Sequence, residues 1–311
     1  MESIWFGTDA RSQLIRGSLI PASLAYAGGS ILFRKVYDWG LKRAQSPHPR
    51  AICVGNLTVG GSGKTPVTVA IGKFLSDQGC RVIIGASGYG SPAAEGANFA
   101  PDGPLAPSQW GDEPAVIRAN LPELPMVVGR DRVQAAQIAF AKDPNSVLLM
   151  DDGFQHLRLR VKVPILIEGE TRNVFCIPAG PFREHPSARR YACRSIREPD
   201  EIQYVRFAEH PVEVPYYLLT AIARPERFIG SATALAGRPP FASVIRPDHD
   251  PLRDGNLLGE IPSGSTILTT EKDWVKISRR PDVDRHDWNV VRQTASLSPE
   301  FFEWLLQELE S

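Results

Sequence analysis

Short apolar runs alternate with helical patterns over the middle of the chain. Runs rich in Val, Ile and Leu, typical of buried strands, occur at 51–54, 81–85, 125–129, 146–150 and 163–167. Helices are predicted at 65–78, 114–120 and 131–141, and a loop rich in Pro, Ala and Gly at 91–107. Strands that alternate with helices predict βαβ units and a parallel sheet.

A second set of elements begins near Tyr216. Strands are predicted at 217–222, 241–245 and 265–269, and helices at 225–235 and 299–309. Ser298 as N-cap and Pro299 at the first helical position mark the start of the last helix. The basic segment 183–197 has no clear period and is predicted to be rich in loops. We expect a larger α/β domain at 46–215 and a smaller one at 216–311.

The first 45 residues form a third segment with its own pattern. Residues 17–33 carry no charge, but the run is shorter than the about 20 residues of a membrane span and contains Pro21, so a spanning helix is not predicted. Residues 31–43 interleave aromatic and aliphatic residues with four basic ones. That basic amphipathic pattern suits a helix on an anionic membrane surface, and it fits an ordinary helix packed on its own domain equally well.

Composition excludes some classes of protein. The 311 residues are 42% hydrophobic, enough for two ordinary domains, and 35 basic residues balance 35 acidic ones. A chain without net charge is not expected to bind nucleic acid through a general basic surface. The four cysteines form no C-x-x-C pair and no zinc-like cluster, so we expect free thiols in a reducing cytoplasm.

A glycine-rich loop lies between the first apolar run and the first predicted helix. In a phosphate-binding loop, glycines let backbone N–H groups face phosphate oxygens, a Lys reaches the β- and γ-phosphates, and a Ser or Thr hydroxyl binds Mg²⁺. The strict pattern has Gly where this chain has Thr58, and the alternative is a glycine-rich turn with an exposed Lys. We predict an ATP site formed by Thr58, Val59, Gly60, Gly61, Ser62, Gly63, Lys64 and Thr65.

Two carboxylates, Asp151 and Asp152, end the apolar run at 146–150. A carboxylate at the end of a strand beside a phosphate-binding loop can hold Mg²⁺ directly or through water. Taken alone, an Asp that merely ends a strand is an equally good interpretation. Together with the phosphate-binding loop, the pattern favours Thr65, Asp151 and Asp152 as Mg²⁺ ligands.

Several blocks of sequence resemble the tetraacyldisaccharide 4'-kinase family, over most of the chain. D-D-G-F-Q-H at 151–156 and P-A-G-P-F-R-E at 178–184 are specific, and weaker blocks lie at 55–66, 88–90, 111–114, 128–132, 248–249 and 270–273. The resemblance implies a P-loop NTPase-like parallel-sheet domain, a smaller C-terminal α/β domain and an N-terminal amphipathic membrane-docking helix. It also implies transfer of the γ-phosphate of ATP to the 4'-hydroxyl of tetraacyldisaccharide 1-phosphate, which gives lipid IVA for lipid A and lipopolysaccharide.

The resemblance further assigns roles to matching positions, at the cytoplasmic face of the bacterial inner membrane. Lys64 and Asp151 would act on the phosphates and Mg²⁺, and Asp112 would take the proton of the sugar hydroxyl with His249 as its partner. A neighbouring imidazole can orient a carboxylate that is a weak base near neutrality. The residues expected to line the substrate site are Tyr89, Arg132, Arg183 and Glu184.

Simpler interpretations stand beside these roles. Asp112 could be a helix N-cap before Pro114, and His249 a solvated histidine of a loop. The arginines of 183–197 suit a solvated face as well as an anionic lipid head group. The chain also departs from the family where Ser87 replaces an arginine and Asp250 a second histidine, which bears on substrate contacts.

Two other functions are compatible with parts of this sequence. A different P-loop NTPase or kinase with a G-G-x-G-K-T loop is the main alternative, but a GTPase would need N-K-x-D, and Lys272 and Asp273 are adjacent. A membrane-associated ATP sensor without catalysis would keep Lys64 and would not need Asp112 as a base. Whether Asp112 and His249 meet without a movement of domains is not determined by the sequence.

Overall fold

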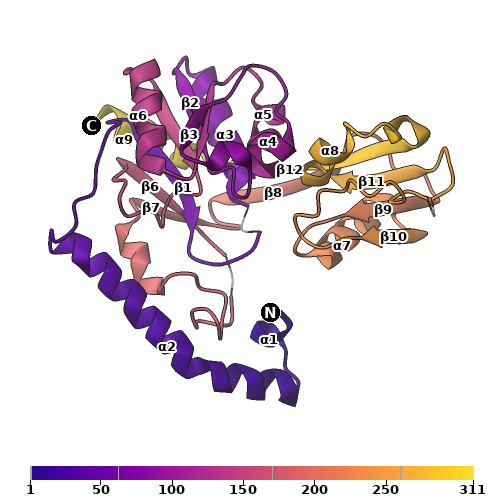
Figure 1. Cartoon of the computed structure of the whole chain (residues 1–311), viewed down its shortest axis with the longest axis horizontal. Coiled ribbons are helices and arrows are strands. Elements are labelled where there is room, and N and C mark those ends of the chain that lie inside the picture. Colours follow the sequence, from indigo (N-terminus) through magenta and orange to yellow (C-terminus); the bar gives the residue numbers. More distant parts are fainter. Residues whose placement is uncertain (1, 62, 170, 260) are drawn as a thin grey trace.

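The chain forms two lobes and a long N-terminal helix that lies along the larger lobe (Figure 1). The computed structural model describes residues 2–61, 63–169, 171–259 and 261–311. We call residues 46–200 together with the C-terminal helix the large lobe, and residues 202–297 the small lobe. The mixed α/β class predicted from the alternating pattern is confirmed, and parallel strands dominate both sheets.

A seven-stranded sheet with the order β3-β4-β2-β5-β1-β6-β7 forms the large lobe. Its pairings are parallel except that of β3 with β4. The strands are β1 (Ala51–Asn56), β2 (Val82–Ala86), β3 (Ala97–Phe99), β4 (Met126–Gly129), β5 (Val147–Asp151), β6 (Val163–Glu168) and β7 (Arg194–Arg197). The central strands β1, β2, β4 and β5 are buried throughout, as expected for a parallel sheet that is covered on both faces.

Helices cover both faces of this sheet. One face packs on α3 (Lys64–Asp77), α5 (Asp112–Asn120) and α9 (Pro299–Glu310), and the other on α6 (Arg132–Lys142). Alternate residues of one strand serve the two cores: Ile52 and Val54 face the first, Ala51 and Cys53 the second. Shorter helical turns are η1 (Pro92–Ala94), α4 (Pro107–Trp110) and η2 (Pro186–Tyr191).

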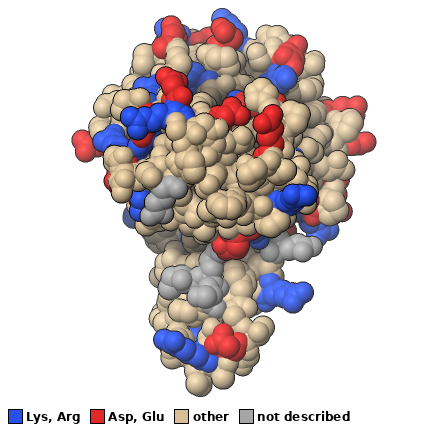
Figure 2. All heavy atoms as spheres, turned by 90° about the vertical axis from the view of Figure 1, so that its right-hand side faces the viewer, with Lys and Arg blue, Asp and Glu red and all other residues tan. Residues whose placement is uncertain are grey.

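The small lobe is a five-stranded sheet with the order β10-β9-β11-β12-β8. Only β8 is antiparallel to its neighbour. The elements are β8 (Ile202–Ala208), β9 (Tyr216–Thr220), α7 (Pro225–Ala236), β10 (Ala242–Ile245), β11 (Thr266–Thr270), α8 (Glu271–Ile277), η3 (Val283–Arg285) and β12 (Asp287–Leu297). Figure 2 shows the face of the molecule that this lobe presents, with acidic and basic residues interspersed, in keeping with the zero net charge.

The two lobes are joined by the antiparallel ribbon of β8 and β12, which runs from one lobe to the other (Figure 1). The division expected near residue 215 stays a prediction, since β8 starts in the core of the large lobe, with Ile202 and its partner Leu297, and continues into the small lobe. The chain then returns, since Phe301, Leu305 and Leu309 of α9 belong to the core of the large lobe. Neither strand of the ribbon was predicted: β8 is mostly exposed, and β12 is polar in its second half, so the apolar signal is weak.

Two N-terminal helices, α1 (Glu2–Phe6) and α2 (Ala10–Asp38), precede the large lobe. The helix α2 touches the lobe through small and polar residues, and only Ser23 and Arg34 of it are buried. Ser23 donates to Cys176 O at 2.6 Å, and Tyr26 donates to Arg183 O at 2.8 Å. In the described residues no helix is both long and apolar enough to cross a membrane.

Candidate active site

The glycine-rich loop joins the end of β1 to the start of α3, in the middle of the large sheet. Ligands of such sheets bind outside the carboxyl ends of the strands, where the connections leave in opposite directions. Here β1 lies between β5 and β6, and the chain continues from β1 to β2 on the far side of β5. Of the predicted loop residues, Ser62 lies outside the described part of the chain, and the others lie at this edge.

Asn56, the last residue of β1, organises the loop. Its side-chain oxygen accepts from Lys64 Nζ at 3.1 Å and from an Arg183 nitrogen at 2.6 Å. Its amide nitrogen donates to the backbone oxygen of Thr58 at 2.7 Å. The Lys64 ammonium is thus held at the mouth of the loop, 3.7 Å from Asp152 Oδ2. Asn56 was not singled out from the sequence, although it lies in one of the weaker sequence blocks.

Asp151 lies at the end of β5, the strand next to β1, and its carboxylate is buried. Oδ2 accepts from the Thr65 hydroxyl at 3.2 Å and Oδ1 from the Thr68 hydroxyl at 3.0 Å. Burial raises the pKa of Asp151, although the nearby Lys64 acts in the opposite direction. A threonine hydroxyl and a carboxylate side by side are oxygen ligands of the kind that Mg²⁺ prefers, with phosphate oxygens and water completing its shell.

The carboxylate of Asp152 has different hydrogen-bond partners from that of Asp151. It has a left-handed backbone, φ 52°, and its carboxylate binds both terminal nitrogens of Arg183, at 2.5 and 3.2 Å. Burial acts to raise the pKa of Asp152, but the charges of Lys64 and Arg183 outweigh it and hold the pKa below its usual value. Asp152 is therefore an ionised partner of two cations, which suits a group near bound phosphate.

Asp112 reaches the same edge from another helix. It is the first residue of α5, after Gly111 with φ 93°, and α5 leads into β4. Because α5 precedes a parallel strand and α3 follows one, both helices have their N-termini at the carboxyl edge of the sheet, and the two helices contact each other. Gly111 leaves no room for a side chain, since an added Cβ would be 3.0 Å from Gly88 Cα. Asp112 is thus not the N-cap, which is Gly111.

His249 of the small lobe meets Asp112 of the large lobe. Nδ1 of His249 is 3.3 Å from Asp112 Oδ2, so the pair forms without any further movement of the lobes. Lys276 Nζ is 3.0 Å from the same oxygen, and Lys272 Nζ is 3.4 Å from His249 Nε2. The backbone of His249 is left-handed, φ 63°, which aims this residue out of its loop. Neither lysine was predicted to belong to the site.

These contacts shift both pKa values. Burial acts to raise the pKa of Asp112, but the hydrogen bond to His249 and the charge of Lys276 outweigh it, so the pKa is lowered. The hydrogen bond to Asp112 raises the pKa of His249, against burial and the charge of Lys272. Asp112 is therefore ionised near neutral pH, as a proton acceptor must be.

Two predicted substrate ligands are committed to other partners. Arg132 is 1% exposed and donates to the backbone oxygens of Asp151 and Asp152, whereas its other two side-chain nitrogens have no hydrogen-bond partner among the described residues. Glu184 is 6% exposed and forms an ion pair with Arg34 of α2. Their role as substrate ligands stays a prediction, and contact with a ligand would require each side chain to leave a buried partner.

The other two predicted substrate ligands remain accessible. Arg183 contacts Asp152 and Asn56 beside the phosphate loop. Tyr89 is 72% exposed and lies against the guanidinium of Arg130, 5.5 Å from its ring centre. Its loop adjoins the start of α5, since Gly88 packs against Gly111. Tyr89 and Asp112 therefore lie on adjacent loops.

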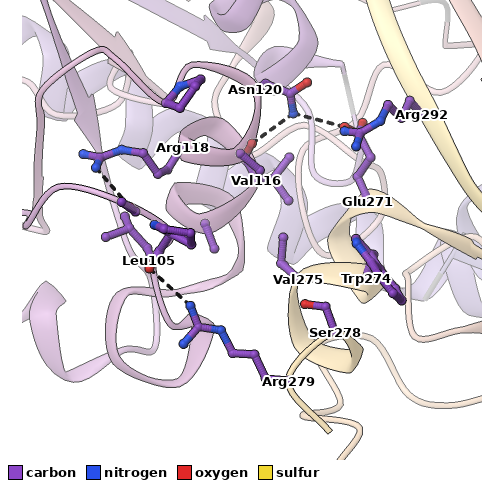
Figure 3. Close-up of a pocket in the computed structure, with 15 residues that line it drawn as sticks. Leu105, Val116, Arg118, Asn120, Glu271, Trp274, Val275, Ser278, Arg279 and Arg292 are labelled. Atoms are coloured by element: carbon purple, nitrogen blue, oxygen red, sulfur yellow. Dashed lines mark hydrogen bonds and ion pairs between the residues drawn. The ribbon is translucent and has the colours of Figure 1, made fainter. Parts of the chain in front are cut away.

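A cavity of about 290 Å³ lies between the lobes, between α5 and α8 (Figure 3). None of the predicted site residues lines it. Around it, Asn120 donates to Glu271 at 3.0 Å, Glu271 pairs with Arg292 at 2.8 Å, and Arg279 donates to Pro104 O at 3.2 Å. These bonds join α5 to α8 and β12, and they fix the position of α8 relative to Asp112.

Comparison with known proteins gives one consistent family. The family model described as tetraacyldisaccharide-1-P 4'-kinase matches residues 15–204 and 200–310. A tetraacyldisaccharide 4'-kinase of Shewanella pealeana is 30% identical over 100% of this chain and 97% of its own length. That of Herminiimonas arsenicoxydans is 33% identical over 99% of this chain and 96% of its own.

A solved structure is similar as well. The LpxK of Aquifex aeolicus, described as an "apo" form in complex with ATP, superposes with a TM-score of 0.78 at 25% sequence identity. The match covers 95% of this chain and 99% of the other. The likeness therefore extends over both lobes.

Proposed function

Because this chain belongs to the tetraacyldisaccharide-1-P 4'-kinase family, we propose that it transfers the γ-phosphate of ATP to the 4'-hydroxyl of a tetraacyldisaccharide 1-phosphate. The product is lipid IVA, an intermediate of lipid A biosynthesis. The observation that carries this proposal is the position of Asp112 and His249 at the same sheet edge as Lys64 and Asp151.

The nucleotide is held at the phosphate loop. Backbone N–H groups of the loop and the Lys64 ammonium bind the β- and γ-phosphates, for which Lys64 leaves Asp152. Thr65 and Asp151, with Asp152 beside them, would hold Mg²⁺, and Mg²⁺ neutralises charge on the phosphate oxygens when it is bound. Arg183 lies beside Asp152, where it can bind a phosphate of either substrate.

The reaction needs a base and an aligned acceptor. Asp112 takes the proton of the 4'-hydroxyl as the sugar oxygen forms a bond to the γ-phosphorus. The bond from that phosphorus to the oxygen bridging the β- and γ-phosphates breaks, and ADP leaves with both electrons. The hydrogen bond from His249 orients the carboxylate of Asp112 through the step.

The lipid acceptor requires access to a membrane, and α2 supports this. Large apolar side chains of α2 are exposed: Leu14, Leu24, Ile31, Leu32 and Phe33. The residues that face the lobe, Ser23, Ala27, Ser30 and Arg34, repeat at helical spacing. Such a helix lies in the interface of a bilayer, and we place the protein at the cytoplasmic face of the inner membrane, where ATP is available.

The test is phosphate transfer from radiolabelled ATP to tetraacyldisaccharide 1-phosphate in detergent micelles. The wild type is expected to give a 4'-phosphorylated product. Asp112→Asn keeps the shape of the side chain but removes the base, so kcat falls by about 10²- to 10⁴-fold while the KM for ATP changes little. Asp102→Asn, on an exposed loop, is the control.

Two outcomes would contradict the proposal. Folded wild-type protein that forms no product is not this kinase. Full activity of Asp112→Asn would instead show that Asp112 is not the base. Wild-type protein that binds ATP but transfers no phosphate would favour an ATP sensor.

A further inference from the structure

The helix α8 presents two lysines to the Asp112–His249 pair. Lys272 and Lys276 are four residues apart, so they lie on one face of α8, one turn from each other. Lys276 Nζ is 3.0 Å from Asp112 Oδ2, and Lys272 Nζ is 3.4 Å from His249 Nε2. Each member of the pair therefore has its own lysine, and both lysines belong to the small lobe.

Lys276 holds one oxygen of Asp112. Its side chain is 4% exposed, and its ammonium also donates to Asp250 O at 3.0 Å, which fixes its position. Oδ2 of Asp112 is shared by Lys276 and His249. Within the described residues no hydrogen bond reaches Oδ1 of Asp112, so this oxygen is left for the acceptor hydroxyl.

Lys272 lies beside the outer nitrogen of the histidine. Its ammonium group has no acceptor, so a hydrogen bond to His249 Nε2 requires that nitrogen to carry no proton, whereas Asp248 Oδ2, 3.7 Å from the same nitrogen, acts in the opposite direction. The ring proton is left on Nδ1, which faces Asp112 Oδ2. Two carboxylates also lie near the Lys272 ammonium, Asp248 at 3.6 Å and Glu113 at 3.7 Å.

We propose that Lys276 and Lys272 are positioning residues for the phosphate transfer. Lys276 keeps Asp112 ionised and oriented with Oδ1 free, and Lys272 opposes a proton on Nε2 of His249, so that the ring donates to Asp112 through Nδ1. This inference rests on the proposed function, in which Asp112 is the base. Because both lysines come from the small lobe, the base is complete only when the lobes are in contact.

The position of α8 supports this coupling between the lobes. Asn120 of α5 donates to Glu271, the first residue of α8, and Glu271 pairs with Arg292 of β12 (Figure 3). Asp112 begins α5, and Lys276 lies on α8, so the same pair of helices carries both contacts. A shift of the small lobe away from α5 would separate Asp112 from His249 and both lysines at once.

Lys276→Met tests the first half through a pH profile of kcat/KM. Removing the positive charge raises the pKa of Asp112, so the acid limb of the profile moves to higher pH, by about one unit. The rate on the plateau falls by roughly 10- to 100-fold because Asp112 is no longer oriented. Lys276→Arg keeps the charge and is expected to return the limb toward its original position. Lys73→Met, an exposed lysine of α3, is the control.

A loss of rate in Lys276→Met with an unmoved acid limb would overturn this half, because a merely structural residue would give that result. If the acid limb of Lys276→Arg lies at the same pH as that of Lys276→Met, the proposed role of the Lys276 charge would also be contradicted. Circular dichroism of both variants shows whether they fold.

The second half is tested without substrate, by ¹⁵N NMR of histidine-labelled full-length protein, with the His249 signals identified from His249→Gln. At pH 9 we expect the neutral ring with its proton on Nδ1. Lys272→Met is expected to raise the pKa of His249, since a like charge is removed, and to allow the Nε2–H form. A wild-type ring protonated on Nε2, or an unchanged titration in Lys272→Met, would overturn it. Because NMR needs no turnover, this result is independent of whether the wild type is a kinase.

Discussion

At the scale of residues, Asp151 and Asp152 are neighbours in sequence with carboxylates in opposite electrostatic environments. Asp151 is buried beside two threonine hydroxyls, and its pKa is raised; Asp152 binds Arg183 and lies near Lys64, and its pKa is lowered. The ionised form of Asp151 is therefore unfavourable in the folded protein, whereas that of Asp152 is favourable. At this end of β5, the ionised carboxylate of Asp151 therefore destabilises the folded protein, whereas that of Asp152 stabilises it.

We expect Asp151→Asn to lose activity and gain stability. The kinase rate falls by about 10²-fold or more, because a ligand near the transferring phosphate is lost. Without nucleotide or metal, the melting temperature rises at pH 8, and the gain disappears below the pKa of the unfolded carboxyl, about 3.9. Melting curves at both pH values, with chelator, measure this.

Asp152→Asn is the matched comparison, with the opposite sign. Its folded pKa is lowered, so the native carboxylate stabilises the protein above the unfolded pKa, and that stability is lost as the pH falls. The variant is expected to melt lower than the wild type at pH 8. Equal shifts in the two variants would show that the two environments do not differ as described.

At the scale of elements, α2 differs from the usual surface helix because several of its large apolar residues are exposed. Its contacts with the large lobe are made by small and polar residues and include the buried Arg34–Glu184 pair. Arg34 also lies against the rings of Phe154 and Tyr191. The helix is thus attached through specific polar contacts, and its exposed apolar residues remain available for the proposed contact with a bilayer.

Three negative charges at exposed apolar positions of α2 should weaken membrane binding. We expect the triple variant Leu24→Glu, Leu32→Glu and Phe33→Glu to bind anionic liposomes at least about tenfold more weakly, since each exposed side chain loses its burial in lipid. Sedimentation with liposomes measures this. Val214→Glu, Leu235→Glu and Ile245→Glu place the same charges on exposed apolar positions of the small lobe and are the control. Unchanged partitioning of the α2 variant would contradict the docking role.

At the scale of the whole molecule, the ribbon between the lobes touches the phosphate loop. Tyr204 of β8 donates to Gly63 O at 3.3 Å, and Gly63 has φ 73°. A Cβ added at Gly63 would be 2.3 Å from the Tyr204 hydroxyl. The ribbon that joins the lobes is therefore packed against the glycine-rich loop.

We expect Gly63→Ala to disturb both the glycine-rich loop and its contact with the ribbon that joins the lobes. The left-handed backbone alone costs about 1–2 kcal/mol for alanine, and the contact with Tyr204 adds to it. The rise in melting temperature on addition of ATP should be largely lost. Gly79→Ala, where the backbone is also left-handed (φ 76°) but an added Cβ meets nothing within 4 Å, is the matched control, and Tyr204→Ala in the Gly63→Ala background is expected to restore part of the ATP effect. No restoration would show that Tyr204 is not the obstacle.

The sequence by itself determined the elements with strong local patterns. Apolar runs predicted β1, β2, β4, β5 and β6, whereas β3 and β7 lie in segments predicted as loops. Ser298 caps α9 as expected, its hydroxyl accepting from Phe301 N at 3.2 Å. The phosphate loop and the blocks shared with the kinase family follow from residue type and order alone. Local chemistry is sufficient there because glycine, lysine and buried aliphatic side chains constrain the backbone near them.

Only the tertiary structure decided which residues meet. Lys272 and Lys276 are separated from Asp112 by more than 150 positions of sequence, and no local pattern indicates that a loop and a helix of one lobe complete the other. The same holds for Arg132 and Glu184, which the family resemblance placed at the substrate site and which folding buries beside backbone oxygens and Arg34, respectively. A side chain's chemistry is set by its type, but its pKa, its exposure and its partners are set by the groups that folding places around it.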